Sequence, residues 1–152
     1  PLRGDEKTSS SHISLVIEID LTSFHKPLKE ETISDPETFI VGIIPARWAS
    51  SRFPGKPLHP LLGKPLLQHV IERARLCTEL DDLVVATDDD RIIALCESLG
   101  AKVSRTRSDH PSGTDRIAES AEQFPNATHV LNIQGDEPLI DPELIDDLAT
   151  AL

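Results

Sequence analysis

Short apolar runs alternate with segments of helical periodicity from residue 39 onward, and this alternation limits the chain to one fold class. The runs are apolar at consecutive positions, which is typical of strands buried on both faces of a parallel sheet. The intervening segments repeat apolar residues at the spacing of a helix face. We therefore predict an α/β fold of three layers, in which a mostly parallel sheet carries helices on both faces.

The expected elements can be placed along the chain. Strands are predicted at Phe39–Ile44, Leu83–Thr87, Ala101–Arg105 and Thr128–Ile133. Helices are predicted from about Pro65 to Cys77, over Ile92–Leu99 with a stop at Gly100, along the stripe Ile117, Ala118, Ala121 and Phe124, and from Asp141-Pro142 through Leu148. Ligands of such sheets bind outside the carboxyl ends of the strands, so the loops leaving those ends form the candidate site.

Residues 1–38 differ in character from the rest. They contain the polar run Thr8–His12 and the turn signal Asp35-Pro36. Between these, Ile13–Asp20 is rich in β-branched residues and has the pattern of a strand. We expect residues 1–38 to be an extension of unknown role and residues 39–152 to form the main unit.

Composition excludes several classes of protein. The chain carries 15 Lys and Arg against 26 Asp and Glu, a net charge of −11, whereas a nucleic-acid binder needs a basic face. The apolar runs are too short to span a bilayer. Two cysteines provide no disulfide framework. These features predict a cytoplasmic protein that binds neither nucleic acid nor membrane.

One loop departs from the acidic balance. No Asp or Glu occurs between Ile40 and Ile71, and this stretch carries Arg47, Arg52, Lys56 and Lys64. The loop leaves the carboxyl end of the first buried strand, where cations and backbone N–H groups together suit a polyphosphate. It contains neither a P-loop nor a dinucleotide-binding glycine pattern. From charge alone, a solvated basic loop whose arginines pair with surface carboxylates explains it equally well.

Three segments carry a resemblance to a known family. Residues 44–58 read IPARWASSRFPGKPL, residues 109–116 read DHPSGTDR, and residues 132–140 read NIQGDEPLI. Together and in this order they closely resemble the motifs of the 3-deoxy-manno-octulosonate (Kdo) cytidylyltransferases. Departures are mild: Trp48 stands where that family usually has Tyr, Ser51 where it has Thr, and Phe53 where it has Leu.

The resemblance implies a nucleotide-diphospho-sugar transferase-like fold and a reaction. Residues 39–152 are then the CTP-binding half of the enzyme, with the carboxyl-terminal half missing. The family converts CTP and Kdo to CMP-Kdo and pyrophosphate with Mg²⁺, for lipopolysaccharide biosynthesis, as a homodimer. Its sugar contacts, its second metal-ligating Asp and its dimer interface belong to the half not found here. We therefore predict little or no turnover by these 152 residues alone.

Roles follow for particular residues. The predicted catalytic residues are Arg52 and Lys56, which would bind the β- and γ-phosphates, and Asp136, which would ligate Mg²⁺. The predicted nucleotide-binding residues are Pro45, Ala46, Arg47, Arg52, Lys56, Arg107, Ser112, Gly113 and Gln134.

Other polar residues in these loops have structural explanations. Ser112 and Asp115 are spaced as a capping box, and Asp88-Asp89-Asp90 opens a helix, where carboxylates favour the helix dipole. Lys64 lies outside the motifs, and His110 is interpreted as a loop residue. Two alternative functions stay open: a nucleotide-binding fragment without turnover, and a cytidylyltransferase for amino-Kdo or another nonulosonic acid.

Overall fold

A five-stranded sheet forms the centre of the molecule in the computed structural model, which describes residues 18–20, 37–50 and 52–152. The strand order is β1 (Glu18–Asp20), β7 (His129–Asn132), β2 (Ile40–Pro45), β5 (Asp82–Thr87) and β6 (Lys102–Arg105). The last four strands run parallel to one another, and β1 pairs antiparallel with β7 at the edge. The predicted mostly parallel sheet is confirmed.

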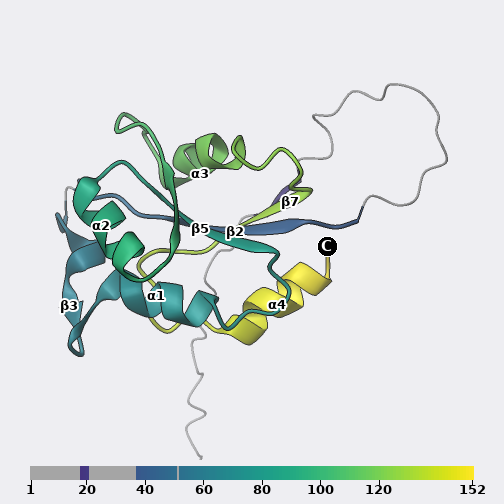
Figure 1. Ribbon diagram of the computed structural model, residues 1–152, viewed down its shortest axis with the longest axis horizontal. Coiled ribbons are helices and arrows are strands. Elements are labelled where there is room, and N and C mark those ends of the chain that lie inside the picture. Colours follow the sequence, from purple (N-terminus) through teal and green to yellow (C-terminus); the bar gives the residue numbers. More distant parts are fainter. Residues whose placement is uncertain (1–17, 21–36, 51) are drawn as a thin grey trace, which may run out of the picture.

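Helices cover both faces of this sheet (Figure 1). On one face, α3 (Gly113–Ala121) packs Ile117 and Ala121 against the strands. On the other face lie α1 (Leu66–Ala74), α2 (Asp90–Ser98) and α4 (Pro142–Thr150). Because adjacent residues of a strand point to opposite faces, Ile43 of β2 enters the first core and Ile44 the second. The three-layer α/β prediction is therefore confirmed.

Local capping explains where the helices begin. Asp89 and Asp141 accept hydrogen bonds from backbone N–H groups two residues further on, at the starts of α2 and α4. Pro65, which we expected in the first turn of α1, is the residue just before it. The stop at Gly100 is confirmed, and this glycine has the positive φ, 60°, typical of a helix end.

Smaller elements follow β2 that the sequence pattern did not predict. The 3-10 turn η2 (Lys56–Leu58) is followed by a hairpin of β3 (Pro60–Leu61) and β4 (Lys64–Pro65). Together, η2, β3 and β4 connect β2 to α1 through the acid-free loop.

The predicted helix after Arg105 ends at Ala121, and Phe124 packs against the core from beyond its end.

Part of the amino-terminal segment has a place in the fold. Glu18–Asp20, the end of the predicted strand over residues 13–20, forms β1. Residues 13–17 lie outside the described residues. Among the described residues, no helix has the length and apolar character needed to cross a membrane.

Candidate nucleotide-binding site

A cleft of about 490 Å³ opens at the carboxyl ends of β2 and β7, beside the amino terminus of α3. This is the edge of a parallel sheet at which ligands bind, and the volume is in the range of small-molecule sites. The structure brings to it every predicted site residue except Arg107 and Ser112: the lining contains Pro45, Ala46, Arg47, Arg52, Lys56, Gly113, Gln134 and Asp136.

Lys56 and Asp136 face each other across this cleft. The Lys56 Nζ atom donates a hydrogen bond to Asp136 Oδ2 at 2.6 Å. Lys56 begins η2, and Asp136 lies in the loop after β7, so the pair joins two segments that are 80 positions apart in the sequence. Both side chains are partly exposed, at 38% and 53%. A cation and a carboxylate are thus both within reach of one bound ligand.

The main chain is also shaped for close approach. A Cβ on Gly135 would lie 2.5 Å from the carbonyl oxygen of Pro45, which no side chain tolerates. The loop after β7 can therefore lie directly against the end of β2 only because this residue is glycine. Gly113 lines the same cleft and begins α3, whose first N–H groups favour negatively charged ligands.

Ser112 has the capping role that its spacing indicates. Its hydroxyl oxygen accepts the Asp115 N–H at 3.2 Å, and its own O–H donates to the Asp115 carboxylate. In a full capping box the acid accepts the backbone N–H of the cap residue instead. Ser112 does not line the cleft itself, and it holds the helix end that carries Gly113.

The structure does not bring Arg107 to the cleft. Its backbone N–H donates to the carboxylate of Glu119, and its Nε lies 3.5 Å from Asp109. Together with His110 and Glu119 it lines a separate hollow of about 410 Å³. Contact with the His110 imidazole, followed by the Arg107 N–H, lowers the pKa of Glu119 below its ordinary value. Arg107 is thus held by acidic neighbours away from the other cations.

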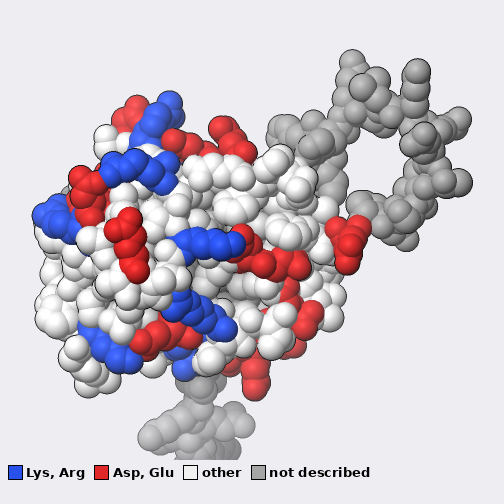
Figure 2. All heavy atoms as spheres, in the orientation of Figure 1, with Lys and Arg blue, Asp and Glu red and all other residues white. Residues whose placement is uncertain are grey.

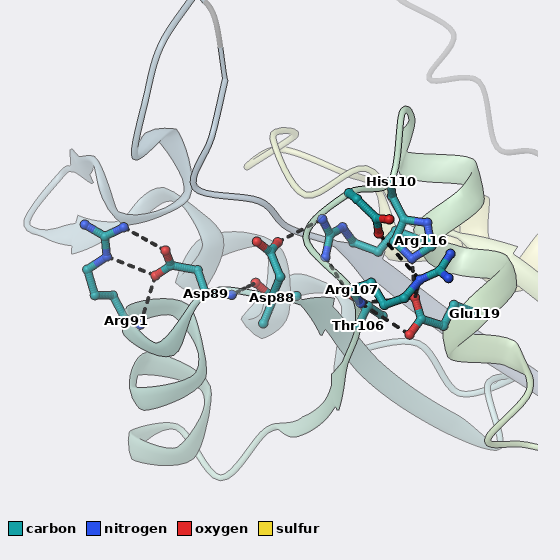
Figure 3. Close-up of polar contacts among 10 residues, drawn as sticks. Asp88, Asp89, Arg91, Thr106, Arg107, His110, Arg116 and Glu119 are labelled. Atoms are coloured by element: carbon teal, nitrogen blue, oxygen red, sulfur yellow. Dashed lines mark hydrogen bonds and ion pairs between the residues drawn. The ribbon is translucent and has the colours of Figure 1, made fainter.

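Arg116 is a charged cleft residue that sequence reasoning missed. It comes from α3 with only 2% of its surface exposed. Its Nη2 lies 2.8 Å from Asp88 Oδ1, and its Nη1 donates to the Thr106 hydroxyl (Figure 3). The available signal was that Arg116 is the last residue of the second motif. Four further residues line the cleft without having been predicted: Ser50, Phe53, Pro57 and Gly135.

Asp88, Asp89 and Asp90 each have a partner, and the predicted place at a helix start is found for Asp89 and Asp90. Asp88 pairs with Arg116, Asp89 caps α2, and Asp90 pairs with Arg105. Among the described residues there is no group of three or more metal-binding side chains. Of the described residues that line the cleft, Asp136 is the one with a carboxylate.

Lysines of the acid-free stretch pair with acids in two different settings. Lys64 contacts Glu72 on the exposed surface, at 2.8 Å, which agrees with the structural role we expected for it. Lys56 contacts Asp136 inside the cleft. Figure 2 shows basic side chains interspersed with acidic ones over the left and centre of one face, and mainly acidic side chains at its right. On this face the basic side chains are thus mixed with acidic ones and do not form a continuous basic surface.

Comparison with known proteins identifies the family of this chain. The family described as Cytidylyltransferase matches residues 41–152. The chain belongs to the cytidylyltransferase family.

Among curated relatives, the 3-deoxy-manno-octulosonate cytidylyltransferase of Solibacter usitatus is 56% identical over 107 residues, which are 70% of this chain and 42% of that protein. The mitochondrial enzyme of the same name from Arabidopsis thaliana is 54% identical over 114 residues, 74% and 39% of the two chains. A solved CMP:2-keto-3-deoxy-manno-octonic acid synthetase complexed with CTP is 44% identical, with a TM-score of 0.72, over 75% of this chain and 47% of that one. A cytidylyltransferase structure from Leptospira borgpetersenii has 25% identity and a TM-score of 0.68, over 76% and 49%.

The resemblance read from the three motifs is thus confirmed at the level of the family. The chain spans less than half the length of these curated relatives and solved structures.

Proposed function

We propose that this chain forms the CTP-binding part of an enzyme that transfers a cytidylyl group from CTP to Kdo, giving CMP-Kdo and pyrophosphate for lipopolysaccharide biosynthesis. The observation that carries the proposal is the cleft in which Lys56 and Asp136 lie 2.6 Å apart, between the acid-free loop and the loop after β7. A triphosphate with a bound cation needs both kinds of charge in one place.

In the reaction, the anomeric hydroxyl oxygen of Kdo attacks the α-phosphorus of CTP. The bond from that phosphorus to the β-phosphate oxygen breaks, pyrophosphate leaves, and the hydroxyl proton passes to solvent. Negative charge grows on the departing group, so fixed cations beside it stabilise the transition state. Lys56 and Arg52, which both line the cleft, take this role. Arg47 and the main chain of Pro45 and Ala46, which line the cleft, contact the nucleotide, and Gln134 hydrogen-bonds the base or the sugar.

The residues present fit Mg²⁺ when phosphate oxygens complete its coordination. Mg²⁺ commonly takes one or two carboxylates and fills its remaining positions with phosphate oxygens and water. Among the described residues lining the cleft, the carboxylate of Asp136 is available for this purpose, at 53% exposure and not locked in a buried pair. When bound, Mg²⁺ held by Asp136 would offset the negative charge of the triphosphate and lower the pKa of the attacking hydroxyl.

A second candidate is CTP binding without turnover. It is favoured by the single carboxylate in the described cleft lining and by the share of the relatives that the chain spans, 42% for the Solibacter enzyme. We propose that residues for the sugar, for a second metal contact and for a homodimer interface lie in the part of the relatives beyond this match. Because the proposed sugar-binding residues lie beyond this match, amino-Kdo or another nonulosonic acid is an alternative acceptor. A cytoplasmic location stays a prediction.

Three measurements test these proposals. Titration calorimetry with Mg²⁺ should detect binding of CTP and weaker binding of UTP; absence of CTP binding would refute the proposed function. Pyrophosphate release from CTP, Kdo and Mg²⁺ should be near background for the 152 residues, and robust release would refute the second candidate. Competition between Kdo and other acidic sugars in any active form would identify the acceptor.

A further inference from the structure

The loop that carries Arg52 and Lys56 is closed on itself through Trp48. The Gly55 N–H donates to the Trp48 carbonyl oxygen at 2.9 Å. Gly55 also has a positive φ of 74°, and a Cβ at this position would lie 2.7 Å from the indole ring. The ring therefore packs directly on the backbone of Gly55, and Lys56 is the next residue. The ring thus contacts the residue that precedes η2, the element from which Lys56 reaches the cleft.

Arg91 lies over the indole ring of Trp48. The Cζ atom of its guanidinium lies 3.3 Å from the ring centroid, the geometry of a cation–π contact. The three closest atoms to a Gly55 Cβ are Cη2, Cζ2 and Cζ3 of the six-membered ring, so Trp48 contacts both Gly55 of its own loop and Arg91 of α2.

Asp89 fixes the orientation of the Arg91 guanidinium. Its Nε and Nη2 donate to the two carboxylate oxygens of Asp89, at 2.9 and 2.7 Å (Figure 3). Asp89 is the cap of α2, and its side chain is 15% exposed. A bidentate contact leaves the guanidinium plane little freedom. The chain of contacts therefore runs from the start of α2 through Arg91 and Trp48 to Gly55.

We propose that Arg91 is a positioning residue that acts through Trp48 to hold the loop of Arg52 and Lys56 in its phosphate-binding conformation. The acid-free loop contains no carboxylate of its own, so the contacts that order it come from outside: Asp136 pairs with Lys56, and Arg91 of α2 lies over Trp48. The contact from α2 adds an anchor at Trp48 without placing a negative charge in the loop. The role in CTP binding rests on the proposed function, whereas the ordering of the loop does not.

Trp48 is the only tryptophan of the chain, so its fluorescence reports on the stack without a label. We expect Arg91→Ala to raise the acrylamide quenching constant of Trp48 clearly above the wild-type value, and Arg91→Lys, which keeps a cation, to lie between the two. The matched control is Arg105→Ala, which removes an exposed arginine paired with Asp90 at the same end of α2. Equal quenching in Arg91→Ala, Arg105→Ala and wild type would overturn the proposal.

Ordering of the loop is measured separately by trypsin. The Arg52–Phe53 bond lies within the loop, and cleavage there, followed by mass spectrometry, should be about two to ten times faster in Arg91→Ala than in wild type or Arg105→Ala. The calorimetric dissociation constant for CTP with Mg²⁺ should rise by a similar factor in Arg91→Ala alone. Unchanged cleavage refutes the positioning role. Faster cleavage with unchanged CTP affinity refutes the link to phosphate binding. Failure of the wild type to bind CTP refutes the proposed function, while quenching and cleavage still decide the ordering of the loop.

Discussion

Replacing Lys56 by alanine separates a role in binding from a role in folding. The ion pair with Asp136 joins side chains that are 38% and 53% exposed, and such pairs contribute about 1 kcal/mol or less to stability. A loss of this size lowers the melting temperature of a domain of this length by no more than about 4 °C. The fold should therefore survive the substitution nearly unchanged.

Binding of CTP should respond much more strongly. Removing a charged donor from a phosphate costs about 1.5 to 3 kcal/mol, which is roughly a 10- to 150-fold rise in the dissociation constant. The assay is calorimetric titration of CTP in the presence of Mg²⁺, with thermal unfolding of the same samples.

The matched control is Lys64→Ala. Lys64 belongs to the same acid-free stretch and also pairs with a carboxylate, that of Glu72, at similar exposure, but it does not line the cleft. Its removal should leave the CTP dissociation constant within about twofold of wild type. Equal loss of affinity in both variants, or a fall of many degrees in the melting temperature of Lys56→Ala alone, would refute the reasoning.

Three further substitutions test other parts of the structure. Arg116→Leu leaves Asp88 without its partner; because that carboxylate is 21% exposed, we expect urea unfolding to show a loss near the lower end of the usual 3 to 5 kcal/mol. Gly135→Ala brings a Cβ to 2.5 Å from the Pro45 carbonyl oxygen and should cost about 1 to 3 kcal/mol while weakening CTP binding. For Asp146, burial works to raise the pKa, but two backbone N–H groups and a hydroxyl after α1 outweigh it and keep the pKa below the ordinary 3.8. Its stabilisation is complete above pH 3.8 and is lost as the pH falls through the lower folded value, so Asp146→Asn should flatten the stability curve on this acid side.

Each of these has a control and a contradicting result. Arg105→Ala breaks an exposed pair and should unfold like wild type, so a similar loss there would contradict a special cost at Arg116. Gly113→Ala meets the Pro45 side chain only at 3.7 Å, an ordinary contact; if it were as harmful as Gly135→Ala, the close approach would not be the cause. If stability falls with decreasing pH in Asp146→Asn as it does in wild type, other carboxyl groups determine the loss of stability in acid.

Much of the fold is local and was therefore predictable. Strand and helix periodicity depends on neighbouring residues, and the starts of α2, α3 and α4 depend on Asp89, Ser112 and Asp141, which cap them within three positions. The hairpin of β3 and β4 was missed because each strand has two residues, too few for a pattern to appear. The strand predicted over residues 13–20 includes β1, Glu18–Asp20. Its antiparallel pairing with β7 was not predicted.

By itself the sequence determined that the chain forms a layered α/β fold. It also determined that a carboxylate-free basic loop and an acidic turn follow the carboxyl ends of strands. Both could be read from the sequence because periodicity and composition are properties of short segments. Only the tertiary structure decided which charges meet. Lys56 contacts Asp136, which is 80 positions away in the sequence. Glu119 holds Arg107 away from the cleft, whereas Arg116, which no sequence pattern singled out, lines it. These side-chain contacts depend on how strands and helices far apart in the sequence pack together, and a local sequence pattern does not contain that information.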